Sequence, residues 1–241
     1  MSPNVSRGQR RPRLALLIGA VGAVLALAVA AGSGEDGESI AVADQAVAAE
    51  HSHTTAAPVI HTEAGHAFHD EMRKLWEDHV TWTRLAIVSF VDDLADLKPT
   101  VARLLQNQTD IGDAIKPYYG DEAGEQLTTL LEGHINGAVD LLAAAKAGDQ
   151  KQVTKATAAW YRNGNQIADF LSEANPENWP REEMRSMMKT HLDQTLSEAT
   201  QRIEGDHEAE IRTYDEIHDH ILEMADALSQ GLFAQFPEKF E

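Results

Sequence analysis

Apolar residues recur with a helical period from about residue 64 to the end of the chain. Spacings of three, four and seven residues place such side chains on one face of an α-helix. No segment alternates apolar and polar residues as a half-buried strand does, so the pattern predicts an all-α fold. The two clearest stripes run through Met72, Leu75, Trp76, His79, Thr83, Ala86, Ile87, Phe90 and Leu94, and through Leu127, Leu130, Leu131, His134, Ala138, Leu141, Leu142 and Ala145.

Turn-forming residues interrupt this period at five places. Proline suits the first turn of a helix and glycine suits its end, so Pro99, Pro180, Gly120 and Gly148 mark boundaries. Short connections make consecutive helices antiparallel neighbours, which predicts an up-down helical bundle of about six helices built from three hairpin repeats. The expected helices span roughly residues 64–94, 99–117, 121–147, 149–173, 180–203 and 207–232.

The first helix of each expected hairpin carries a histidine in its apolar stripe. His79, His134 and His191 are spaced 55 and 57 residues apart. The second helix of each hairpin offers a polar partner at a matching level. Because a helix rises about 1.5 Å per residue, His134 and Asn163 lie at about the same distance from their turn. The repeat therefore predicts one internal polar layer, with Asn107, Asn163 and either His218 or His220 as the partners.

Such a layer has more than one physical use. Buried polar side chains must be hydrogen-bonded, so the layer could simply fix the register of the helices. Imidazole nitrogens also suit copper and zinc, and the layer could hold one such ion. A small organic ligand between the helices is a further possibility. The proposed metal ligands are His79, His134, His191 and His218, with Asn107 and Asn163 completing the layer.

The N-terminal segment is expected to direct the chain out of the cytoplasm. Four arginines precede an apolar run over residues 14–31, which is typical of a signal peptide or membrane anchor over residues 1–31. Residues 32–63 resemble a flexible linker, and residues 64–238 form the helical bundle domain. An extracytoplasmic location follows, either secreted or anchored to the membrane by this segment alone. Histidines cluster in and beside the linker as candidates for weak metal binding: His51, His53, His61, His66 and His69.

Composition removes several classes of function. The 39 acidic residues outnumber the 20 basic ones, for a formal charge of -19, so nucleic acid is not an expected partner. The chain has no cysteine, which excludes thiolate metal sites and thiol catalysis. Phosphate-binding loops and the common hydrolase motifs are missing as well. These observations favour a binding or sensing module over an enzyme, and leave its protein partner undefined.

Four segments of the chain stand out in combination: LWEDHVTWTR, LLQNQTDIGDAIKPYYG, NPENW and YDEIHDHILEMAD. Taken together, they resemble an uncharacterised bacterial family of exported or membrane-anchored helical-bundle proteins. The resemblance covers about residues 70 to 238 and implies the helical fold but no activity. It includes His79, Asn107, His134, His191 and His218, whereas His220 and the histidine-rich linker lie outside its pattern. The resemblance therefore favours His218 over His220, which is kept as a secondary weak ligand.

Overall fold

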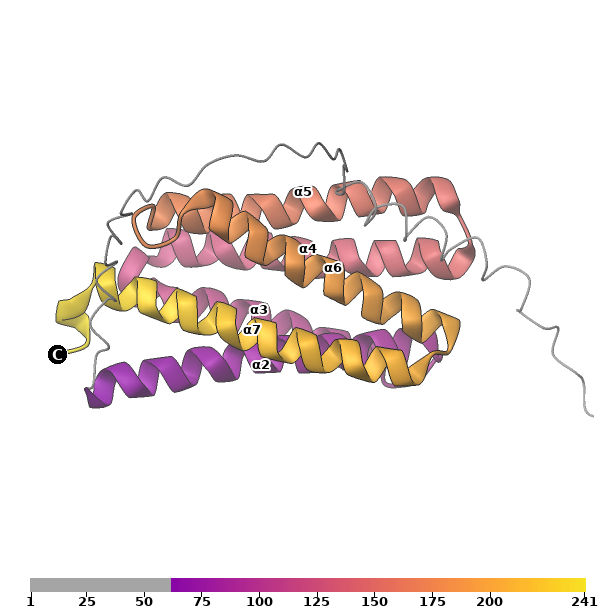
Figure 1. Cartoon of the computed structure of the whole chain (residues 1–241), viewed down its shortest axis with the longest axis horizontal. Coiled ribbons are helices and arrows are strands. Elements are labelled where there is room, and N and C mark those ends of the chain that lie inside the picture. The colour runs from indigo at the N-terminus through magenta and orange to yellow at the C-terminus, as the bar shows by residue number, and fades with distance from the viewer. Residues whose placement is uncertain (1–61) are drawn as a thin grey trace, which may run out of the picture.

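The computed structural model describes residues 62–241, which form six long helices and a terminal 3-10 turn (Figure 1). The expected all-α fold with six helices is confirmed for this part of the chain. The signal or anchor segment, and the linker histidines His51, His53 and His61, lie outside the described residues. The elements are α2 (Glu63–Val91), α3 (Leu97–Tyr119), α4 (Asp121–Ala147), α5 (Gln150–Ala174), α6 (Arg181–Glu204), α7 (His207–Gln235) and η3 (Pro237–Lys239).

The second and third hairpins have the same two-residue turn. Gly148 and Gly205 end α4 and α6 with φ of 69° and 80°, a left-handed conformation that glycine adopts without strain. The next residue in each case is an aspartate whose side chain caps the following helix, from Asp149 to the Gln152 amide and from Asp206 to the Ala209 amide. Both hairpins therefore have the same short turn.

The first hairpin has a longer turn, and its helix ends differ from the expected ones. Helix α2 ends at Val91 and not at residue 94 as expected, and Asp93 takes a φ of 55° in place of a glycine. Helix α3 begins at Leu97, two residues before the expected start, and continues through Pro117 to Tyr119. The longer turn is held by Ser89, whose hydroxyl donates to Asp96 over 2.9 Å.

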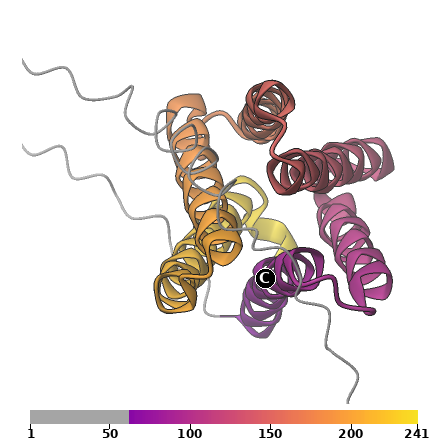
Figure 2. The ribbon, with the colours of Figure 1, turned by 90° about the vertical axis from the view of Figure 1, so that its right-hand side faces the viewer.

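The helices are arranged as a closed ring in chain order. Each helix packs against its chain neighbours, and α7 closes the ring by packing along α2. The end-on view in Figure 2 shows this order. Helix α6 is oblique in Figure 1: it starts beside α5 and ends near α2 and α7. The three helices that open the hairpins, α2, α4 and α6, carry the three histidines of the expected layer.

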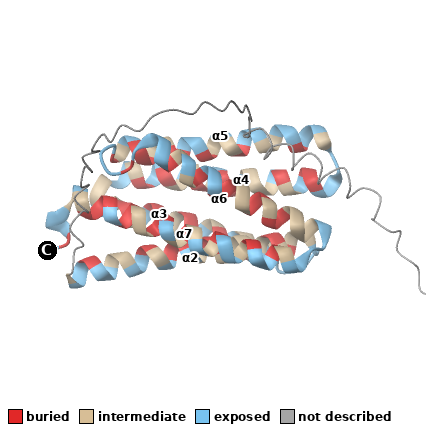
Figure 3. Ribbon diagram, viewed as in Figure 1, coloured by how far each residue is buried: buried red, intermediate tan, exposed pale blue. Residues whose placement is uncertain are grey.

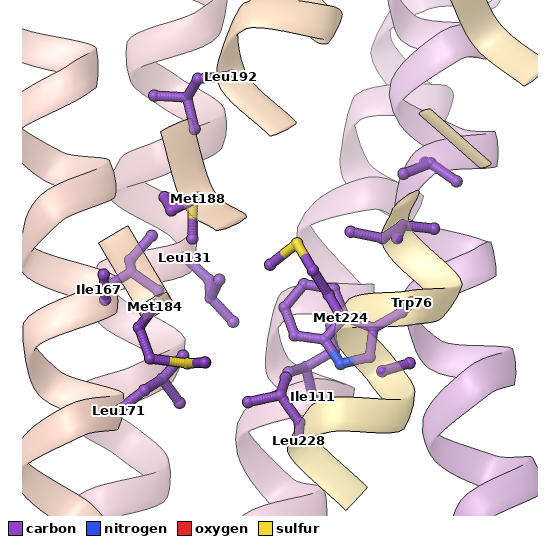
Figure 4. Packing of buried hydrophobic residues seen from close by; sticks show 14 of the residues in the cluster. Trp76, Ile111, Leu131, Ile167, Leu171, Met184, Met188, Leu192, Met224 and Leu228 are labelled. Carbon is purple, nitrogen blue, oxygen red and sulfur yellow. The ribbon is translucent and has the colours of Figure 1, made fainter. Parts of the chain in front are cut away.

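The buried residues line the inner faces of all six helices (Figure 3). Figure 4 shows Leu131 and Met188 on one side of this interior and Trp76 and Met224 on the other. The same pattern of buried apolar residues surrounds each of the three histidines. In every hairpin, the residues seven and three positions before the histidine and one position after it are buried and apolar. These triplets are Met72, Leu127 and Met184; Trp76, Leu131 and Met188; and Val80, Ile135 and Leu192.

The C-terminus closes the end of the bundle opposite the hairpin turns. Phe240 is buried and packs against Phe68, Tyr118 and Phe233, while the Thr62 hydroxyl donates to the Phe240 carbonyl. Both ends of the described chain are thereby fixed to the same aromatic cluster. Within residues 62–241, none of the helices is both long and apolar enough to span a membrane.

Candidate functional site

Three histidines meet in the interior of the ring. His79 on α2, His134 on α4 and His191 on α6 have relative exposures of 2%, 4% and 4%. The ring centroid of His191 lies 5.6 Å from that of His79 and 6.3 Å from that of His134. We call these three residues the histidine triad. The helical stripes place them inward, but only the closed ring brings α2, α4 and α6 together at one level.

Each triad histidine is accompanied by one interhelical hydrogen bond within its own hairpin. The acceptor is always the backbone carbonyl four residues before the histidine, and the donor is a side chain of the hairpin's second helix. Asn107 donates to the Leu75 carbonyl over 2.9 Å, and Asn163 donates to the Leu130 carbonyl over 3.0 Å. In the third hairpin, Nε2 of His220 donates to the Met187 carbonyl over 3.0 Å.

His220, and not His218, is thus the third member of the partner set. The preference for His218 is wrong in this respect. His218 lies two residues away on α7, with its side chain 31% exposed and its Nε2 3.2 Å from the Glu77 carboxylate. Side chains at i and i+2 point to different sides of a helix, so one of the two histidines had to face outward. His218 does not join the triad.

The sequence carried a signal that would have selected His220. Asn107, Asn163 and His220 are spaced 56 and 57 residues apart, close to the 55 and 57 of the triad. His218 would give a second spacing of 55, which breaks the parallel with the triad. The hydrogen bond to the backbone carbonyl comes from asparagine in the first two hairpins and from histidine in the third. A search for the same residue type in all three hairpins therefore misses His220.

Hydrogen bonding fixes which nitrogen of His134 carries the proton. The Asn163 amide group uses its NH₂ to bond the Leu130 carbonyl, so its oxygen faces Nδ1 of His134 at 2.9 Å as an acceptor. Nδ1 of His134 therefore donates, and a neutral His134 has its lone pair on Nε2. By contrast, among the described residues Nδ1 of His79 and Nδ1 of His191 are buried without a hydrogen-bond partner.

Burial keeps the triad neutral. Desolvation lowers the pKa of His79 to about 3, with His134 adding to the shift and the nearby Gln108 carboxamide opposing it. Desolvation also lowers the pKa of His134 to about 4, against the effect of Asn163. The pKa of His191 falls well below its ordinary value, mainly through desolvation and then through His79, His134 and His220. All three imidazoles therefore present lone pairs at neutral pH.

The three imidazole rings lie close together but do not form a metal site. Within residues 62–241, no three His, Asp or Glu side chains already stand in a metal-ligand arrangement. Trp160 holds the triad on one side: its ring stacks on His134 with centroids 5.1 Å apart, and its Nε1 donates to the His134 carbonyl over 3.1 Å. His134 is thus held in place by Asn163 and Trp160, whereas Nδ1 of His79 and Nδ1 of His191 have no hydrogen-bond partner.

The two described histidines at the start of α2 lie away from the triad. His66 is exposed, and Nε2 of His69 is 3.0 Å from an Asp226 oxygen that also binds Arg73 at 2.6 Å. A guanidinium already occupies the carboxylate that a metal at His69 would need. His69 therefore belongs to the contact between α2 and α7.

Comparison with family models, with curated proteins and with solved structures found no match to this chain.

Proposed function

We propose that this protein is an exported binding or sensing module whose histidine triad takes one transition metal ion, copper or zinc. The observation that supports this most is the buried Nδ1 of His191, which has no hydrogen-bond partner. Nδ1 of His79 also has no partner of normal hydrogen-bond geometry, although the Gln108 carboxamide lies close enough to affect its pKa. Leaving a buried polar atom without a partner costs roughly 1 to 3 kcal/mol. A bound ion would remove that cost at both histidines.

The distances of the His191 ring from the other two rings are close to those of imidazoles that share one ion. At metal–nitrogen distances of about 2.0 to 2.1 Å, imidazoles on one tetrahedral or trigonal centre have centroids about 5 to 6 Å apart. The observed separations of 5.6 and 6.3 Å are at or just above that range.

The surround of His134 supports the same proposal. Metal-binding imidazoles normally donate their second N–H to an oxygen, which orients the ring and increases its basicity. Asn163 supplies that oxygen to Nδ1 of His134, so Nε2 is the nitrogen for the metal. We therefore assign the triad a binding role.

The competing function is a purely structural layer that fixes helix register. The three carbonyl bonds from Asn107, Asn163 and His220 support this alternative, because they already lock each hairpin. Those bonds, however, involve none of the free nitrogens of His79 and His191. A register device would be complete without placing three imidazoles against one another.

The test is metal binding by the full-length chain in which His51, His53 and His61 are replaced by glutamine. Zn(II) or Cu(II) at one hundred times Kd would stabilise the fold by about 2.7 kcal/mol. For a domain of this size that raises Tm by roughly 5 to 10 °C. Co(II) would give the visible absorption of nitrogen coordination.

His191→Gln and His134→Gln should abolish the Tm rise and the Co(II) spectrum, while the matched surface change His218→Gln should keep both. A flat melting temperature with both metals, or a rise that survives in the triad variants, would overturn the metal proposal and leave the structural layer.

A further inference from the structure

An apolar cavity of about 210 Å³ lies between the helices, beyond the triad on the side of the hairpin turns. Its walls come from α2, α3, α4, α5 and α6. The inner wall includes Leu104, Trp160 and Thr195, which are buried, and the outer wall includes Phe90 and Ile203, which are half-buried. The cavity therefore reaches from the interior toward the surface.

The cavity begins one helical turn beyond the triad. Thr83, Ala138 and Thr195 line it, and each stands four residues after a triad histidine. Trp160 connects the two regions, because its ring lines the cavity and also stacks on His134. The triad itself is not part of the lining, so the cavity is a separate site.

The walls offer almost no free hydrogen-bonding group. The hydroxyls of Thr83, Thr195 and Thr200 all donate to carbonyls of their own helices, over 2.7 to 2.8 Å. The indole N–H of Trp160 is likewise used, on the His134 carbonyl. No Asp, Glu, Lys, Arg or His lines the cavity, and the one carboxamide, Asn136, is exposed at its edge.

We propose that this cavity binds an uncharged, compact hydrophobic molecule with at most one polar group, directed at Asn136. A charged or strongly polar ligand would lose its hydration without compensation from these walls. Size limits the ligand as well, since an apolar protein cavity of about 150 Å³ holds benzene. A volume of about 210 Å³ therefore fits a two-ring aromatic or a chain of about six to eight carbons. The proposal is independent of the metal.

The experiment uses the full-length, metal-free chain with two matched probes. The uncharged probe is 2-naphthol and the charged one is naphthalene-2-sulfonate, which has the same ring system. Calorimetric titration should detect 2-naphthol at one site, with the sulfonate at least tenfold weaker. Equal affinity for the two probes, or no binding of 2-naphthol, would overturn the proposal.

Two cavity-filling variants locate the site. Ala199→Leu on α6 and Ala138→Leu on α4 add bulk to two different helices that line the cavity, and each should weaken 2-naphthol binding at least tenfold. Ala158→Leu makes the same change at an exposed position on α5 and should leave binding unchanged. Binding that is undiminished in a folded filling variant would show that the probe lies elsewhere and would refute the site.

Discussion

At the level of single residues, the third hairpin shows that position and geometry matter more than residue identity. His220 performs with an imidazole N–H what Asn107 and Asn163 perform with a carboxamide, on a carbonyl at the equivalent position. His218, which the family resemblance favours, instead contacts Glu77 at the surface. We therefore expect His218 and His220, although only two residues apart on α7, to contribute very differently to the free energy of unfolding.

Replacing His220 with alanine should lower the free energy of unfolding by about 1 to 3 kcal/mol, because the Met187 carbonyl loses its partner in a partly buried contact. His220→Asn should recover part of that loss, since asparagine serves this position in the other hairpins. His218→Ala should cost less than about 1 kcal/mol, as exposed ion pairs contribute little.

Urea denaturation of the three variants at pH 7.5 measures these differences. A larger loss from His218→Ala than from His220→Ala would contradict the assignment of His220 to the partner set.

At the level of helices, two glycines allow α3 and α4 to approach each other closely. Gly112 and Gly124 face each other there, and a Cβ on Gly112 would lie 2.6 Å from the Gly124 carbonyl oxygen and 2.0 Å from Oγ1 of Thr128. A backbone atom cannot move aside as a flexible side chain can. The glycines therefore set how near these two helices lie.

We predict that Gly112→Ala lowers the free energy of unfolding by roughly 2 kcal/mol, within the range for overpacking a close contact. The matched control is Gly133→Ala on α4, where the added Cβ meets only Nδ2 of Asn163 at 3.5 Å. This control should stabilise by about 0.5 to 1 kcal/mol, because alanine favours a helix interior. Thermal and urea unfolding of both variants test the difference, and a neutral Gly112→Ala would disprove the tight contact.

At the level of the whole molecule, a buried ionic cluster helps to close the ring. Arg84 on α2 lies 2.9 Å from the Glu198 carboxylate on α6 and 2.8 Å from that of Glu210 on α7. Arg202 also binds Glu210, over 3.2 Å, and bonds Asp92 in the first hairpin turn. Burial raises the pKa of Glu198 to about 7, with Glu210 adding to the shift and Arg84 opposing it. The cluster joins the first hairpin to the third.

The triad and Glu198 act on stability in opposite senses as pH falls. The triad pKa values are lowered in the folded state, so the unfolded chain takes up protons first and stability is lost below pH 6.5. The pKa of Glu198 is raised, so the folded chain takes up its proton first and stability is gained between pH 7 and 4.5. As pH falls, the stability lost through the three histidines exceeds the stability gained through Glu198.

We therefore predict that the metal-free protein loses roughly 3 kcal/mol of stability between pH 7.5 and pH 5.0, counting about 1.4 kcal/mol per pH unit and group. His134→Gln should reduce this pH dependence by roughly 2 kcal/mol, and His218→Gln should leave it unchanged. Urea denaturation at the two pH values provides the measurement. A stability that is constant or higher at pH 5.0 would show that the triad is not held neutral.

The sequence by itself determined the helices and which faces turn inward, because helical period and turn chemistry are local properties. The stripes through His79, His134 and His191 predicted three buried histidines, and the Gly-Asp turns at 148–149 and 205–206 placed two hairpins correctly. The ends of the helices at the first turn were predicted less well. Asp93 adopts the left-handed conformation there, which glycine usually takes, so no glycine marks this turn in the sequence.

Only the tertiary structure decided which polar groups meet. The periodicity of α7 alone could not separate His218 from His220, because the direction of each depends on how α7 is rotated against α6 and α2. The contact of His191 with both other triad histidines, the cavity beyond them and the Arg84 cluster all join residues more than fifty positions apart. Closure of the ring brings them together, and closure is a property of the packed helices as a set.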